Sequence, residues 1–295
     1  MCTGLFVQTD DGLCYQSRTL EFEMILPFTP VISNNDTIIG STLDGSTYVD
    51  GMNKYGLCAM AFYFKCSYSY NNNLVKCKIN LASYDVCGYL IKNAKSVSDV
   101  IKLSKKINVT QQPFGAPFNS VLPLHWFVSD STGKTIIIET KNGSLICYDN
   151  SKYKVCTNNP TYPEQIINLE KLIKSNNFTY CDPPNDANCG LGKGLVGMPG
   201  DYSSFGRFAR AYILSKGMIT PGYNINATDT LFHFSNNFDI VYGSVRDCTT
   251  NPITYDFTQY TAVYDLTTLT AYYKTYKDQQ IKKLGSLKSP CCKKI

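Results

Sequence analysis

The chain has 295 residues, of which 43% are hydrophobic and 17% charged, a composition typical of a globular protein rather than a disordered one. No apolar run approaches the roughly 18 residues that a membrane-spanning helix needs, and no signal-peptide pattern precedes Cys2. We therefore expect a cytoplasmic protein with no membrane span. Numerous cysteines and five N-x-S/T sequons favour one alternative, a secreted protein whose leader is absent from this sequence.

The net charge of +5 is concentrated at the C-terminal end. The segment 274–295 holds seven lysines and one acidic residue, so the rest of the chain is close to neutral. This pattern indicates a solvated basic tail over 276–295, and we do not expect a nucleic-acid partner. The remaining residues, 2–275, are predicted to form a single domain.

The first half of the chain predicts strands followed by two helices. Turn signals between strand-like runs indicate two strand pairs, at 1–9 with 12–22 and at 37–45 with 55–64. The turn of the second pair is expected within 50–56. Apolar residues then recur with the 3.6-residue period of an α-helix in two segments that carry good helix signals, 80–93 and 96–106.

The second half continues the alternation of strands and helices. Strands are expected in a hairpin over 122–140, and further strands at 144–149, 152–160, 256–266 and 268–276. Helical periodicity marks three segments, 162–175, 203–217 and 227–238. This order predicts an α+β architecture in which helices cover antiparallel sheets. The Gly- and Pro-rich segment 181–201 is expected to be a long loop.

Cys2 follows the initiator methionine directly. Removal of Met1 would leave a residue that carries both a thiol and a free α-amine. The two groups have ordinary pKa values of about 8.5 and about 8, so near neutral pH the amine can accept the thiol proton. Cys2 is therefore a candidate nucleophile with its own base. The alternative is a small residue that serves only to permit removal of the methionine.

Four other residues are candidates for a site around Cys2. A tight first hairpin would bring Arg18 and Glu21 next to the N-terminal residue, where Arg18 favours a thiolate and Glu21 holds an ammonium. Asn158 ends a strand before a proline, and its side chain can donate to an oxyanion. Arg207 begins a helix behind a Gly/Asp/Ser loop. Taken singly, these residues are equally explained as a surface ion pair, a turn and a solvated arginine.

Several motifs in this order resemble the choloylglycine hydrolase family, which includes bile salt hydrolases and penicillin V acylases of the N-terminal-nucleophile superfamily. MCTGL is similar to the family's start, SRTLEF to its Arg-x-x-acid segment, and VCTNNPTY to its Thr-Asn-x-Pro motif. GMPGDYSSFGRFARA is similar to its Pro-Gly-Asp-x-Ser-Ser-x-x-Arg-Phe motif. The segments KINLASYDV, LHWFVSDSTGKTIIIE and TQYTAVYDLTTLTAYYKTY also resemble the family. The resemblance runs nearly from end to end.

The resemblance implies a four-layer αββα sandwich and hydrolysis of a linear amide through a thioester. Cys2 would be the nucleophile, its α-amine the base, and Arg18 the neighbour of the sulfur. Asn158 and the backbone N–H of Asn80 would form the oxyanion hole, and Arg207 would support the network. The family usually has Asp where this chain has Glu21, which puts the transfer of substrate preference in doubt.

The expected substrate is a small-molecule amide with a bulky apolar acyl group, such as a bile-salt conjugate. Phe62, Tyr63 and Phe64 are candidates for the pocket wall. The alternatives are penicillin V acylase activity, N-acyl amine or N-acyl homoserine lactone acylase activity, and a catalytically silent binding protein. No cofactor and no metal site is expected, and His125 and His233 are taken as core residues. The family suggests a homo-oligomer, a dimer or a tetramer.

Overall fold

The structure is a computed structural model that describes residues 1–33, 35, 37–181, 193–218 and 226–288. Residues 182–192 of the predicted loop at 181–201 lie outside the described residues. No helix in the described part of the chain is long and apolar enough to cross a membrane.

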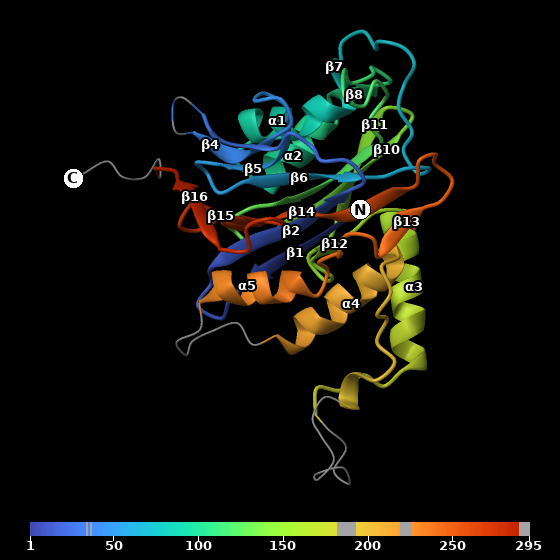
Figure 1. Ribbon diagram of the computed structural model, residues 1–295. Helices are drawn as coiled ribbons and strands as arrows, with labels where there is room; N and C mark the ends of the chain where they lie inside the picture. Colours follow the sequence, from blue (N-terminus) through green and yellow to red (C-terminus); the bar gives the residue numbers. More distant parts are fainter. Residues whose placement is uncertain (34, 36, 182–192, 219–225, 289–295) are drawn as a thin grey trace, which may run out of the picture.

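Two antiparallel sheets form the centre of the molecule (Figure 1). The strand order of the first sheet is β12 (Val155–Cys156), β1 (Cys2–Gln8), β2 (Cys14–Phe22), β14 (Thr254–Asp265), β15 (Thr270–Thr275) and β16 (Lys282–Ser286), with β13 (Val245–Asp247) paired to β14. The strand order of the second sheet is β11 (Ser144–Asp149), β10 (Thr135–Lys141), β9 (Leu124–Ser129), β6 (Cys58–Tyr63), β5 (Tyr48–Asn53), β4 (Ile38–Thr42) and β3 (Thr29–Ile32).

Helices cover the outer face of each sheet (Figure 1). The second sheet is covered by α1 (Ser83–Asn93) and α2 (Val97–Ser104), beside the small parallel pair of β7 (Ile79–Ala82) and β8 (Ile107–Thr110). The first sheet is covered by α3 (Tyr162–Ser175), α4 (Ser204–Gly217) and α5 (Ala227–Asn236). The short 3-10 helix η2 (Lys193–Leu195) precedes α4. The predicted four-layer αββα sandwich is confirmed.

Side-chain alternation on the central strands fills two apolar cores. On β9, Phe127 packs between the sheets, whereas Trp126 and Val128 pack against the layer of α1 and α2. The strand is therefore buried on both faces, which explains why its sequence is a continuous apolar run. Gly4 allows the two sheets to approach closely, because a Cβ at this position would lie 2.7 Å from the Phe62 ring.

Local signals explain where the helices begin. The Ser96 side chain accepts a hydrogen bond from the Asp99 N–H, as expected of an N-cap. At the start of α3, Thr161 and Glu164 form a reciprocal capping box. The Ser203 hydroxyl caps α4 by accepting from the Gly206 N–H at 3.0 Å. This last cap fixes the helix turn that carries Arg207.

Three predicted elements differ from the structure. The segment 50–56, predicted as a turn, contains the end of β5, which lies between β4 and β6, so the two predicted partners are not neighbours. The helix predicted at 80–93 begins at Ser83, because residues 79–82 pair with β8. Part of the predicted tail forms β16, whose backbone pairs with β15, so the first sheet continues past the predicted boundary at 275.

Candidate active site

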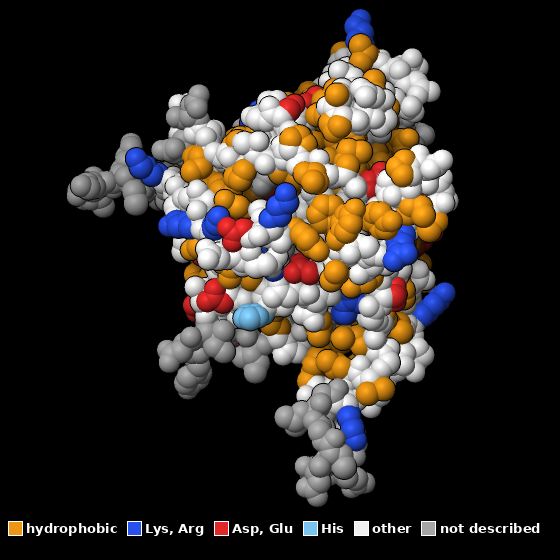
Figure 2. All heavy atoms as spheres, in the orientation of Figure 1, with side chains coloured by type: hydrophobic (Ala, Val, Ile, Leu, Met, Phe, Trp, Pro, Cys, Tyr) orange, Lys and Arg blue, Asp and Glu red, His pale blue; other side chains and the backbone are white. Residues whose placement is uncertain are grey.

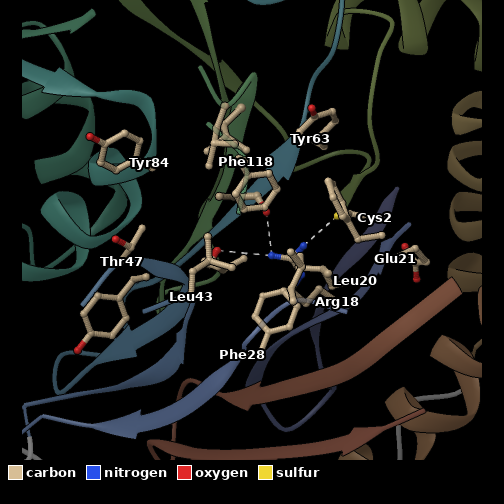
Figure 3. Close-up of a pocket in the computed structure, with 17 residues that line it drawn as sticks. Cys2, Arg18, Leu20, Glu21, Phe28, Leu43, Thr47, Tyr63, Tyr84 and Phe118 are labelled. Atoms are coloured by element: carbon tan, nitrogen blue, oxygen red, sulfur yellow. Dashed lines mark hydrogen bonds between the residues drawn. The ribbon is translucent and has the colours of Figure 1, made fainter. Parts of the chain in front are cut away.

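The β1–β2 hairpin brings Arg18 to the Cys2 thiol. Cys2 lies opposite Leu20 and Gly4 opposite Arg18, so the side chains of Cys2 and Arg18 emerge on the same face of the sheet. The Arg18 Nη2 lies 2.9 Å from the Cys2 Sγ, and both side chains are buried. Figure 3 shows this contact at one end of a cavity. The guanidinium therefore donates a hydrogen bond to the sulfur.

Arg18 is held in place by buried acceptors on the second sheet and by a carboxylate. Its Nη1 donates to the Ala61 carbonyl at 2.8 Å and lies 3.5 Å from the Asp50 carboxylate. Asp50 in turn accepts the hydroxyls of Tyr260 and Tyr264, one on each oxygen. Asp50 and Arg18 are each 0% exposed. The positive charge beside the sulfur therefore has one buried counter-charge with fixed geometry.

Glu21 pairs with the methionine that precedes the thiol. The Met1 ammonium donates to the Glu21 carbonyl oxygen at 2.6 Å, and the Glu21 N–H donates to the Met1 carbonyl at 2.9 Å. The Glu21 carboxylate is buried and accepts the Thr258 hydroxyl at 3.2 Å through one oxygen. Burial raises the pKa of Glu21, although the N-terminal ammonium and Arg207 oppose the shift. Glu21 therefore lies beside the N-terminus through backbone contacts with Met1. The role predicted for its carboxylate, that of holding the Cys2 ammonium, stays a prediction.

The Asn158 amide has a fixed orientation beside Cys2. Its Oδ1 accepts from the Cys2 backbone nitrogen at 2.9 Å and from the Arg207 Nη2 at 2.7 Å. Its Nδ2 donates to the Tyr63 carbonyl at 2.7 Å. Because two donors hold the oxygen, the NH₂ group must face the Tyr63 side. One of its two N–H groups is used there, and the other is available to a ligand.

Arg207 lies on α4 and links this helix to β1 by hydrogen bonds. Its Nη1 donates to the Cys2 carbonyl oxygen and to the Thr3 hydroxyl, and its Nε donates to the Tyr202 carbonyl at 3.0 Å. The side chain is 0% exposed. Arg207 therefore fixes the backbone of Cys2 and the amide of Asn158, and it has little capacity left for a ligand.

Asn80 is the predicted site residue that does not join this cluster. It lies on β7, where its side chain bonds Asn108 at 2.7 Å and the backbone of Val75. It does not line either of the two cavities described below. Figure 1 places β7 in the small parallel pair, away from the N-terminus. Pairing of residues 79–82 with β8 is the physical reason for this position.

Two residues that the sequence analysis did not place in the site are Asp50 and Tyr63. The sequence analysis assigned Asp50 to a turn, because the Asp-Gly pair at 50–51 gives no signal of a buried strand. Tyr63 was considered only as a pocket wall, but its carbonyl also positions Asn158. Phe62 and Phe64 are buried in the core instead, where Phe64 stacks on His125 at 4.2 Å. His125 is buried as predicted, whereas His233 is exposed because it lies on the outer side of α5.

Two cavities adjoin the first two residues, one lined by Cys2 and the other by Met1. The first is narrow, about 60 Å³, and its walls are mostly apolar; beside Cys2, Arg18 and Glu21 it is lined by Leu20, Phe22, Leu26, Phe28, Leu43, Thr47, Tyr48, Val49, Ala61, Tyr63, Tyr84, Phe118, Leu122 and Leu124 (Figure 3). The second is wider, about 590 Å³, and more polar than the first, with Met1, Asn158 and Arg207 in its wall. The cavities share Phe22 and Tyr63.

Hydrophobic side chains gather on the surface of the face that carries the N-terminus (Figure 1 and Figure 2). Figure 1 places the N-terminus beside β13 and β14, and Figure 2 shows hydrophobic side chains gathered across the middle of the same face. Among the described residues, no group of three His, Cys, Asp or Glu side chains could hold a metal ion.

A buried cysteine at the start of the first strand, in a sandwich of two sheets between helical layers, defines the class of N-terminal-nucleophile hydrolases. The model of the linear amide C-N hydrolases, choloylglycine hydrolase family, matches residues 2–289. The chain belongs to this family.

Relatives support the assignment over almost the whole chain. An uncharacterized protein of Paramecium bursaria Chlorella virus 1 is 38% identical and covers 96% of this chain and 100% of its own. The bile salt hydrolase/transferase of Clostridium perfringens is 32% identical over 95% of this chain and 91% of its own. A crystal structure of a mutant conjugated bile acid hydrolase from Clostridium perfringens superposes with a TM-score of 0.81 at 30% identity, covering 96% and 92% of the two chains.

Proposed function

We propose that this protein hydrolyses the amide bond of a small molecule with an apolar acyl group, using Cys2 as the nucleophile once Met1 is removed. The observation that carries the proposal is the contact of the Cys2 sulfur with Arg18 at 2.9 Å in the wall of an apolar cavity, which shares Phe22 and Tyr63 with a wider cavity. The names of the family and of the bile salt hydrolase relatives support the same reaction.

The reaction begins when the Cys2 α-amine accepts the thiol proton and the sulfur attacks the carbonyl carbon. The Cys2 nitrogen already lies 2.9 Å from the Asn158 Oδ1, which would orient the freed amine. The protonated amine then donates to the departing nitrogen, and the C–N bond breaks to leave a thioester. Water, deprotonated by the same amine, hydrolyses the thioester and returns the thiol.

The free N–H of Asn158 supplies one donor for the oxyanion. We assign the second donor to the Tyr63 N–H rather than to Asn80. The Phe64 N–H donates to the Pro123 carbonyl at 2.7 Å, toward β9, and successive residues of a strand present their backbone groups to opposite sides. The Tyr63 N–H therefore faces away from β9, on the side where its carbonyl receives Asn158.

The narrow first cavity favours a slim acyl group. A volume of about 60 Å³ holds a few water molecules, so a steroid requires aromatic wall residues such as Phe28 and Phe118 to move. A linear or single-ring acyl group requires less movement. This observation favours the second candidate function, penicillin V acylase-like or N-acyl amine hydrolysis, over hydrolysis of bile-salt conjugates.

The test compares kcat/KM for glycocholate, penicillin V, N-decanoylglycine and N-acetylglycine after intact-mass analysis has confirmed the removal of Met1. We expect the decanoyl or phenoxyacetyl substrate to be preferred, and Cys2→Ser to lose turnover by orders of magnitude while it remains folded. Cys14→Ser is a matched control, because Cys14 is also buried on the hairpin but lies outside both cavities. Preference for the acetyl substrate, or full activity of Cys2→Ser, would contradict the proposal.

A further inference from the structure

We infer that the second cavity receives the leaving amine, and that it selects a neutral or cationic amine over one that carries a carboxylate or sulfonate. The inference deepens the proposed function and rests on it. It concerns the amine side of the substrate only, and it follows from the position of the cavity and from the charges in its wall.

The position of the cavity follows from the direction of proton transfer. The thiol of Cys2 lines the first cavity, whereas the groups that hold its backbone, Asn158 and Arg207, line the second. Because the Cys2 amine must give its proton to the departing nitrogen, that nitrogen has to lie on the amine side of Cys2. The second cavity is the space on that side.

Met1 lies directly before Cys2, which lines the first cavity. It is half-buried, lines the second cavity, and is held by the paired backbone contacts with Glu21. Its removal frees the Cys2 amine and at the same time extends the polar cavity to that amine. A substrate can then place its acyl group on the Arg18 side and its amine on the Met1 side.

Away from its inner end, where Met1 and Arg207 lie, the wall of the second cavity carries more negative than positive charge. Three carboxylates, those of Glu23, Asp247 and Asp256, line it together with the ammonium of Lys65. Lys65 is close enough to Asp247 to help lower the pKa of that carboxyl, after the hydrogen bonds from Thr249. Glu23 accepts the Thr254 hydroxyl at 2.7 Å, which keeps one carboxylate oxygen at the cavity edge.

Two cationic groups, Arg207 and the N-terminal ammonium, lie at the inner end of the second cavity. They do not reverse the excess of negative charge in its wall. Arg207 is fully buried and uses its N–H groups on Cys2, Thr3, Asn158 and Tyr202. The buried carboxylate of Glu21 lies near it as a counter-charge. The N-terminal ammonium is that of Met1 and is lost with that residue, and the Cys2 amine that replaces it must be neutral when the substrate binds, because it then accepts the thiol proton. An anionic leaving group would therefore meet net negative charge.

The test uses three substrates with the same decanoyl group and different amines: taurine, ethanolamine and ethylenediamine acylated at one nitrogen. We expect kcat/KM to be about tenfold higher for the ethylenediamine conjugate than for the taurine conjugate at low ionic strength, the magnitude of a few partly screened charge contacts. The ratio should shrink in 0.5 M salt, roughly as screening shortens the Debye length. The neutral ethanolamine conjugate should lie between the two.

The double variant Glu23→Gln and Asp256→Asn should reduce the ratio at least about threefold, because it removes two of the three carboxylates. Asp10→Asn, an exposed acid in the β1–β2 turn outside the cavity, should leave the ratio unchanged. Equal rates for all three substrates, a preference for taurine, or a ratio insensitive to the double variant would overturn the inference while leaving the hydrolase intact. Hydrolysis of none of them would instead refute the proposed function, and the inference with it.

Discussion

Replacement of Asp50 by Asn tests whether the buried charge pair behind the thiol holds the site together. The side chain keeps its shape, but the counter-charge of Arg18 is lost. Both partners are 0% exposed and lie 3.5 Å apart. Removal of one partner of a buried ion pair costs about 3–5 kcal/mol, because the remaining charge is left without compensation.

A second cost comes from the two tyrosines. Tyr260 and Tyr264 each donate to a different oxygen of Asp50. An Asn side chain has one oxygen and one NH₂ group, so one hydroxyl faces a donor and loses its acceptor. An unsatisfied buried polar group costs about 1–3 kcal/mol. We therefore expect the free energy of unfolding to fall by about 4 kcal/mol or more, a large part of the 5–15 kcal/mol typical of a folded protein.

Urea unfolding measures this loss, and Tyr264→Phe is the matched control because it removes one hydroxyl and keeps the Asp50 charge. The control should lose about 1 kcal/mol. Alkylation of Cys2 by iodoacetamide, followed by peptide mapping to separate it from the exposed Cys66, Cys77, Cys181 and Cys248, supplies a second measurement. Without the Asp50 carboxylate the guanidinium beside the sulfur loses the group that holds it, so the alkylation rate of Cys2 at a fixed pH should differ from that of the wild type. A loss below 1 kcal/mol together with an unchanged alkylation rate would refute the argument.

Two further predictions concern the oxyanion donor and a buried acid. Asn158→Ala should lower kcat about 10²–10³-fold, the usual cost of one lost preorganised donor. The control Asn159→Ala, at a residue that also lines the second cavity, should change kcat little. Equal losses of kcat in both variants would mean that Asn158 only stabilises the turn. Burial raises the pKa of Glu139 to about 7, so the folded state keeps the proton of this carboxyl at pH values where the unfolded state has lost it. The contribution of this proton to the free energy of unfolding is complete at pH 4 and is lost as the pH rises through 7. In urea, Glu139→Gln should therefore gain about 2–3 kcal/mol on the wild type between pH 4 and pH 8, and a difference independent of pH would contradict this.

The residues that sequence reasoning placed correctly are those whose positions depend on local structure, such as the register of a hairpin or the N-cap of a helix. A three-residue turn fixes the register of β1 and β2, and the register alone brings Arg18 to Cys2. The Ser203 cap fixes the helix turn of Arg207. The helices α3 and α4 begin at recognisable N-caps and were predicted to within one residue of their observed bounds.

The residues that were misplaced or missed depend on contacts that local sequence does not show. Asp50 lies in a segment rich in Gly, Asp and Asn, which favours a turn by propensity. The segment is nevertheless a strand, because its neighbours β4 and β6 bury it and Arg18 balances its charge. Asn80 was assigned from a resemblance of letters, whereas its position is set by parallel pairing with β8, a contact between segments 28 residues apart.

Met1 is held by paired contacts with Glu21 and must be removed before Cys2 has a free amine. The fraction of molecules with a working site therefore depends on how the chain is produced. Each molecule that keeps Met1 has a peptide nitrogen at Cys2 in place of a base, and a side chain in the polar cavity. Strong overexpression that outpaces the aminopeptidase would yield a mixture in which specific activity scales with the trimmed fraction. Affinity tags joined ahead of Met1 would silence every copy. Turnover numbers for this protein should therefore be based on the concentration of active sites, measured by burst titration of the thioester. The concentration of total protein from absorbance at 280 nm would include the inactive molecules.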